Sequence, residues 1–206
     1  MELRNFVIKA FFYLLGLTIM SLGIAMTIEA DLGAGAWDAI NVGLVEIIGL
    51  TVGTWVIIIG AILIVVNALI AKEKPDILAV ITILVLGRFI DFWLLHAFEG
   101  LDLTTLWSRI GLSLGGIVIL GIGVSLYLQP QFSLNPIDNL MISLRKRFGF
   151  SITISKTMTE GFALVVALLV GGPVGIGTIL ILVFIGPMIQ FFEGKANQLM
   201  NKLLSE

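Results

Sequence analysis

The sequence predicts an all-α membrane protein, a polytopic bundle of six transmembrane helices that form a 3+3 inverted repeat. Three observations support this fold class. The chain has 206 residues and is 58% hydrophobic but only 13% charged, whereas soluble domains carry about 25% charged residues. Six apolar segments are long enough to span a bilayer, and glycine and aspartate positions recur one hundred residues apart. Lipid is therefore the expected surrounding of most of the chain.

Each predicted span follows from its length. A helix needs about 20 residues to cross about 30 Å of hydrocarbon. The segments that meet this length are 10–28, 52–71, 77–98, 110–128, 152–171 and 174–192. The first segment is longer than the apolar part of a signal peptide, so we expect it to remain as an uncleaved span.

Two shorter segments, 36–48 and 136–148, are predicted as re-entrant or interfacial half-helices, one in each half of the chain. Each would reach only about 20 Å, too little to cross the hydrocarbon. The second has a clear start signal, with Asn135 at the N-cap and Pro136 at the first helical position.

The two halves of the chain share a pattern. Gly16, Gly23, Asp38, Leu44 and Gly49 correspond to Gly116, Gly123, Asp138, Leu144 and Gly149. We expect a first repeat over 1–100 and a second over 101–206, together forming one membrane domain. Three spans per half is an odd number, so the second repeat would be inverted in the membrane.

The basic residues test this topology independently. With the N-terminus in the cytoplasm, ten of the twelve lysines and arginines fall at or near cytoplasmic ends, and only Arg88 and Arg109 do not. Positive charge gathers on the cytoplasmic side of membrane proteins. Both termini are therefore expected to be cytoplasmic.

Asp38 and Asp138 lead the predicted site. Each lies in the first turn of a half-helix, where a carboxylate can bind free N–H groups and favour the positive end of the helix dipole. Alternatively, each contributes to a solute or cation site near the repeat interface, as broken helices do in inverted-repeat transporters. Asn41 and Asn135, on or next to the same half-helices, are included in this predicted substrate-binding site.

Two charge pairs inside spans complete the predicted substrate-binding residues. Arg88 and Asp91 lie one turn apart on the third span, either as an ion pair or interfacial charge, or as a cavity-lining pair. Lys156 and Glu160 lie four residues apart on the fifth span, where they can pair with each other. The first half has Val56 and Gly60 at the matching positions. This difference favours a role of Lys156 and Glu160 in specificity.

Composition narrows the function classes. The chain has no cysteine and one histidine, His96, which removes disulfides and thiolate chemistry and argues against a histidine metal site or triad. We expect no enzyme activity, no cofactor, no metal and no nucleic acid partner. The expected partners are the lipid bilayer and an unknown small solute or ion. The GxxxG of Gly111 and Gly115 leaves a homodimer open as one alternative.

Several motifs together resemble a known family. They are Gly33 through Asp38, Lys156 with Glu160, Gly171 through Thr178, and Ile185-Gly186-Pro187. With them the chain resembles the YczE/YitT-type bacterial integral membrane proteins, most of all the YczE branch. It departs from that pattern at residues 135–138 and 74–76. The resemblance implies a multi-pass protein of the bacterial plasma (inner) membrane and leaves activity and substrate open.

The leading functional hypothesis is a small-solute transporter or channel with a site at the repeat interface. The alternative is a non-transporting accessory or regulatory membrane protein. Short predicted loops argue mildly against this alternative, because they leave little surface outside the bilayer for a partner.

Overall fold

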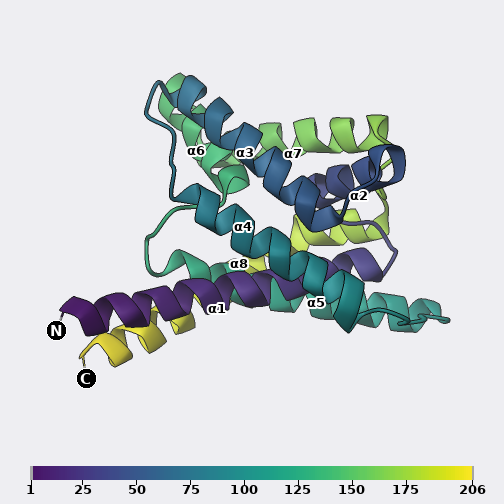
Figure 1. Ribbon diagram of the computed structural model, residues 1–206, viewed down its shortest axis with the longest axis horizontal. Coiled ribbons are helices and arrows are strands. Elements are labelled where there is room, and N and C mark those ends of the chain that lie inside the picture. Colours follow the sequence, from purple (N-terminus) through teal and green to yellow (C-terminus); the bar gives the residue numbers. More distant parts are fainter. Residues whose placement is uncertain (1, 206) are drawn as a thin grey trace. The chain divides into compact units, whose positions relative to one another are not determined.

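The computed structural model describes residues 2–205, and within this range the chain is helical, with no strand (Figure 1). The elements are α1 (Glu2–Glu29), α2 (Ala36–Ile48), α3 (Val52–Ala71), α4 (Ala79–Phe92), the π-helical turn η1 (Trp93–Ala97), α5 (Leu106–Leu128), α6 (Pro136–Phe148), α7 (Ile152–Leu169) and α8 (Ile176–Ser205). All the predicted helical segments are confirmed. The bounds of α2, α3 and α6 agree with the sequence prediction.

The ends of other helices differ from the prediction. α1 begins at Glu2 rather than at residue 10, and α8 continues to Ser205 rather than ending at 192. The prediction counted only apolar residues, but lysine, glutamate and glutamine also favour helix, so both helices extend through polar sequence. The third span begins late, at Ala79, after Pro75, and ends in the π-helical turn η1.

Polar side chains fix several helix starts, as the sequence indicated for α6. The Asn135 side chain accepts a hydrogen bond from the Ile137 N–H at 3.3 Å, and Pro136 follows in the first turn. Thr51, Thr105 and Ser151 cap α3, α5 and α7 in the same way. Such a cap satisfies one of the backbone donors that the first turn leaves without an intrahelical partner.

Among the described residues, six helices are long and apolar enough to cross a membrane: α1, α3, α4 with η1, α5, α7 and α8. Many large apolar side chains on them are exposed, for example Leu169 at 80% and Leu69 at 73%. Soluble proteins rarely expose apolar patches of this extent, whereas hydrocarbon solvates them well. The fold is thus an all-helical, polytopic membrane fold.

The chain divides into two compact units, and each draws on both halves of the sequence. Unit 1 comprises Met1–Gly35, Phe92–Phe132 and Gly175–Glu206, and unit 2 comprises Ala36–Asp91 and Ser133–Val174. The predicted repeat boundary at residue 100 therefore does not coincide with a boundary between compact units.

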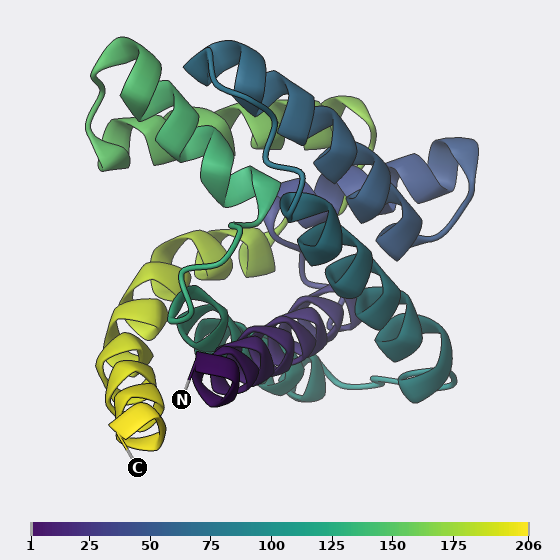
Figure 2. The ribbon, with the colours of Figure 1, turned by 60° about the vertical axis from the view of Figure 1, so that its left-hand side comes forward.

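Unit 1 is built on the close crossing of α1 with α5, which lie side by side in Figure 1. A Cβ on Gly23 would collide with the backbone of Leu120 and Gly116, and one on Gly123 would collide with that of Met20 and Gly16. Small residues allow such approach in lipid. α8 packs on α5 and bends along its length, as Figure 2 shows, with Pro187 inside it.

Unit 2 contains the two short helices. α2 packs against α7 and α3, and α6 packs against α3 and α7. α3 also meets α4 closely, because a Cβ on Gly53 would collide with the Gly87 carbonyl and one on Gly87 with the Gly53 carbonyl. The short helices are therefore each held between two long ones.

Candidate functional site

All the predicted site residues lie in unit 2. They are Asp38 and Asn41 on α2, Arg88 and Asp91 on α4, Asn135 and Asp138 at the start of α6, and Lys156 and Glu160 on α7. Three different helices carry four of them, Asp38, Asp138, Lys156 and Glu160. The fold, rather than the sequence, decides which of them meet.

The fold brings together the helices that carry four of these residues, which we call the carboxylate cluster: Asp38, Asp138, Lys156 and Glu160. α2, with Asp38, and α6, with Asp138, both pack against α7, which carries Lys156 and Glu160. Lys156 is exposed and the three carboxylates are half-buried. No ion pair within 4 Å joins Lys156 to Glu160, so the pair expected from their spacing is not formed.

Buried polar atoms lie on the same helices as this cluster. Asn41 follows Asp38 by one turn and so shares its face of α2; it is 3% exposed, and its Oδ1 has no hydrogen-bond partner among the described residues. The Trp37 Nε1 on α2 and the Ser155 Oγ on α7 are also buried without a hydrogen-bond partner among the described residues. Buried polar groups are ordinarily satisfied by protein or bound water, so such atoms indicate a hydrated or ligand-binding environment.

Asn135 has the capping role that its position predicted. Its side-chain oxygen accepts from the backbone of α6, which leaves its amide group as the part available to a ligand. It is 5% exposed. Asn135 therefore orients the helix that carries Asp138.

Arg88 and Asp91 do not form an ion pair with each other. The Asp91 Oδ1 accepts from the Gly53 N–H and its Oδ2 accepts from the Thr51 hydroxyl, both at 2.7 Å. Asp91 is thus a cap for the start of α3, supplied from α4. Arg88 is exposed. Sequence spacing could not reveal this role of Asp91, because Thr51 and Gly53 lie about forty residues away.

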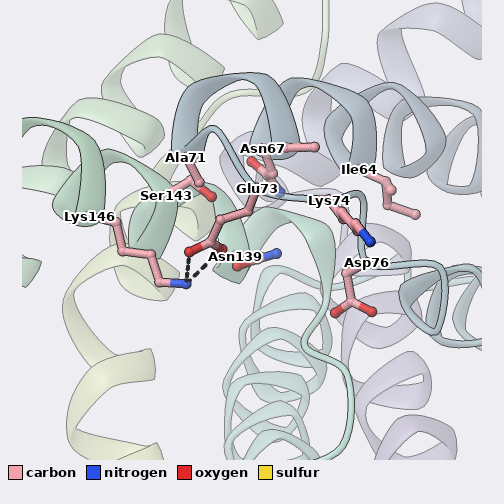
Figure 3. Close-up of a pocket in the computed structure, with 10 residues that line it drawn as sticks. Ile64, Asn67, Ala71, Glu73, Lys74, Asp76, Asn139, Ser143 and Lys146 are labelled. Atoms are coloured by element: carbon pink, nitrogen blue, oxygen red, sulfur yellow. Dashed lines mark hydrogen bonds and ion pairs between the residues drawn. The ribbon is translucent and has the colours of Figure 1, made fainter.

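The sequence analysis missed a polar cavity of about 170 Å³ between α3 and α6, which we call the α3–α6 cavity (Figure 3). Its wall includes Asn67, Glu73, Lys74, Asn139 and Lys146. Two signals could have indicated it. Asn67 is a lone amide in an apolar span, and the 74–76 segment departs from the resembled pattern. As expected for a polar residue in a span, Asn67 makes an interhelical hydrogen bond, from Nδ2 to the Pro136 carbonyl at 2.8 Å.

The acidic residues are not gathered into a recognisable metal site. Within residues 2–205, no three or more Asp, Glu or His side chains are placed to hold one metal ion together. The chemistry that the carboxylate cluster can supply is hydrogen bonding, charge pairing and proton exchange with a solute.

These features define the class of the protein as a polytopic, all-helical membrane protein with charged residues inside its helical bundle. Comparison with known sequences then gives the family. Residues 7–194 match the model of a family of unknown function, DUF6198, and the chain belongs to this family.

Individual relatives agree with this assignment. The chain is 38% identical over 184 residues to the uncharacterized protein YyaS of Bacillus subtilis, which covers 89% of this chain and 92% of the relative. It is 35% identical over 201 residues to the uncharacterized membrane protein YczE of the same organism, covering 96% and 91%. An uncharacterized protein of Haemophilus influenzae is 29% identical over 185 residues, covering 87% and 80%. The expected likeness to YczE is confirmed, and no solved structure matches the chain.

Proposed function

We propose that this protein is a small-solute transporter or channel, with an inverted repeat as its frame and the carboxylate cluster as its site. The observation that carries the proposal is that both short helices pack against α7. α2 carries Asp38 and α6 carries Asp138 at matching positions of their first turns, and α7 carries Lys156 and Glu160. Broken helices that meet in this way are typical of sites at repeat interfaces.

The crossing of α1 and α5 supports the inverted repeat. Gly23 contacts Gly116, and Gly123 contacts Gly16. Gly23 corresponds to Gly123 and Gly16 to Gly116, at a distance of one hundred residues. Exchanging the two halves of the chain therefore turns one contact into the other. Helices related in this way run antiparallel about a two-fold axis, as an inverted repeat requires.

Helix packing in unit 2 supports the same relation. α2 corresponds to α6 and α3 to α7 along the chain. Exchanging the halves converts the α3–α6 contact into the α7–α2 contact, and the α2–α3 contact into the α6–α7 contact, and all four contacts are present. The short helices are therefore proposed to enter from opposite faces of the membrane, as re-entrant half-helices.

The topology follows from charge. The end of α6 carries Arg145, Lys146 and Arg147, whereas α2 has Glu46 near the matching place. We place the basic end of α6 and both termini in the cytoplasm, and the protein in the bacterial plasma membrane. In this orientation the Asp38 turn approaches from outside and the Asp138 turn from the cytoplasm. The proposal assigns no residue a catalytic role.

The test is flux in proteoliposomes. Purified protein is reconstituted and supplied with a panel of labelled small solutes of different charge, while a trapped dye follows internal pH. We expect one solute class to cross, and Asp38→Asn, Asp138→Asn and Glu160→Gln each to slow its flux by about tenfold or more, as for loss of a charge-assisted contact. Asp102→Asn, in a loop of unit 1, is the matched control and should leave flux unchanged.

Two results would overturn the proposal. One is flux that all three cluster variants retain at the wild-type rate. The other is the absence of flux for the whole panel together with crosslinking to one stoichiometric protein partner, which would favour an accessory membrane protein.

A further inference from the structure

We propose that the α3–α6 cavity is a binding site for a small zwitterionic solute, one that carries an ammonium and a carboxylate, as α-amino acids do. The residues that form it are different from those of the carboxylate cluster. The inference concerns binding, so it does not depend on transport.

The buried end of the cavity offers an acceptor that lacks a donor. Asn67 is 3% exposed, and its Nδ2 donates to the Pro136 carbonyl at 2.8 Å. A carbonyl can only accept, so this bond fixes which end of the amide faces Pro136. The Oδ1 is left buried and has no partner among the described residues. Leaving such a group unpaired costs about 1–3 kcal/mol, and a ligand N–H would satisfy it.

Among the charged residues that line the cavity, Lys74 is the cation whose charge is available to a ligand. Lys146 is paired with Glu73, at 2.9 and 3.0 Å to its two carboxylate oxygens, as the dashed lines in Figure 3 mark. Asp76 accepts from the Ser133 hydroxyl at 2.7 Å and from the Leu78 N–H at 3.1 Å. Lys74 has no ion-pair partner within residues 2–205. A ligand carboxylate is the group that matches it.

Two more polar side chains, Asn139 and Ser143, complete the wall from the α6 side. Neither side chain has a hydrogen bond to another residue within the described range 2–205, so both are available to a ligand. A buried acceptor, an unpaired ammonium and two groups that both donate and accept together match a solute with charges of both signs. A simple cation would leave Lys74 unmatched, and a simple anion would leave the Asn67 Oδ1 unmatched.

The size of the cavity limits the ligand. At about 170 Å³, the cavity has the volume of about five or six waters at roughly 30 Å³ each. Sites for drug-sized molecules have volumes of about 300–1,000 Å³. The cavity therefore fits a solute of amino-acid size and is smaller than a typical site for a nucleotide or a peptide.

The experiment is calorimetric titration of the full chain in lipid nanodiscs with glycine, L-alanine and L-serine. Lactate, which lacks the ammonium, and ethylamine, which lacks the carboxylate, are the comparators. We expect at least one amino acid to bind about tenfold or more tightly than either comparator, the difference that one charge-assisted contact makes. Lys74→Gln should weaken that binding by a similar factor. Lys72→Gln, an exposed lysine in the same loop that does not line the cavity, should not.

A second variant tests the cavity without removing a charge. Ser143→Leu places a larger side chain in the cavity from α6 and should abolish binding, while the melting temperature shows that the protein is folded. The inference is overturned if no amino acid binds, if lactate or ethylamine binds equally well, or if Lys74→Gln binds like wild type. Asp38→Asn and Glu160→Gln should leave this binding intact. If the wild-type protein binds an amino acid but shows no flux in proteoliposomes, the cavity is supported as a binding site while the proposed transport function fails.

Discussion

Unit 2 contains two contacts between a short and a long helix, α2 with α7 and α3 with α6, which we call its two corners. Residues at matching positions of the two halves of the chain pack differently in these two corners. In the α2–α7 corner, a Cβ on Gly43 would collide with the Val170 carbonyl and the Gly172 N–H, and one on Gly172 with the Ala39 carbonyl. In the α3–α6 corner, the positions that correspond to Ala39 and Gly43 are Asn139 and Ser143, and both line the cavity. One corner is closed by backbone contact, whereas the other encloses polar space.

The difference lies in the residues that occupy matching positions of the two halves of the chain. Glycine lets two backbones touch in lipid, and that contact leaves no room for a solute. Larger polar residues at the matching positions hold the helices apart and supply hydrogen-bonding groups. Under the proposed inverted repeat, the structure has the corner on the outer side closed and the one on the cytoplasmic side open.

The largest expected effect comes from forcing the closed corner apart. Gly172→Leu should destabilise the protein by about 3 kcal/mol or prevent folding, because overpacking a tight contact against backbone allows little relief. Thermal unfolding in detergent measures the effect. The matched control is Gly161→Ala on α7, where a Cβ would meet nothing within 4 Å. That change should be neutral or stabilise by up to about 1 kcal/mol. Equal effects of the two variants would contradict the close contact at Gly172.

Exchanging the matching residues of the two corners tests the comparison most directly. Gly43→Ser should cost about 1–3 kcal/mol, since the side chain would meet the Val170 carbonyl. Ser143→Gly should cost only the helix propensity difference, about 0.5 kcal/mol. Chemical denaturation of both variants gives the two values. Similar values would mean that the corners are packed alike.

The start of α3 should be more dependent on a distant residue than the start of α7. Asp91→Ala removes the acceptor of the Gly53 N–H and the Thr51 hydroxyl and should cost about 1–2 kcal/mol, as loss of a cap does. α7 is capped by Ser151 alone, so Ser151→Ala should cost about 1 kcal/mol. Hydrogen exchange at the first turn of each helix reports the loss locally. Protection at Gly53 that survives Asp91→Ala would contradict the capping role.

The smallest effect is expected at the Lys146–Glu73 ion pair beside the cavity. Both side chains are about half exposed, at 51% and 56%, and exposed pairs contribute about 0–1 kcal/mol. A double-mutant cycle with Lys146→Gln and Glu73→Gln should give a coupling energy in this range that falls with added salt. A coupling well above it would show that this pair, rather than the polar wall, holds the corner open.

The sequence predicted the helices well because their signals are local. Apolar length located the six long helices, and Asn135 with Pro136 located the start of α6. It also selected Asp38, Asp138, Lys156 and Glu160, which lie on helices that pack together in unit 2. It could not indicate that Asp91 caps α3, because the partners of Asp91 are brought to it only when α3 packs on α4.

The sequence by itself determined which segments are helical and which residues correspond between the two halves. Both depend on local composition, on helix-start chemistry and on the repeated order of residues along one chain. The tertiary structure alone decided that Ala39 and Gly43 close one corner while Asn139 and Ser143 line a cavity in the other. Such a difference depends on which backbone lies opposite each residue, and that distance is set by helix packing rather than by any single segment.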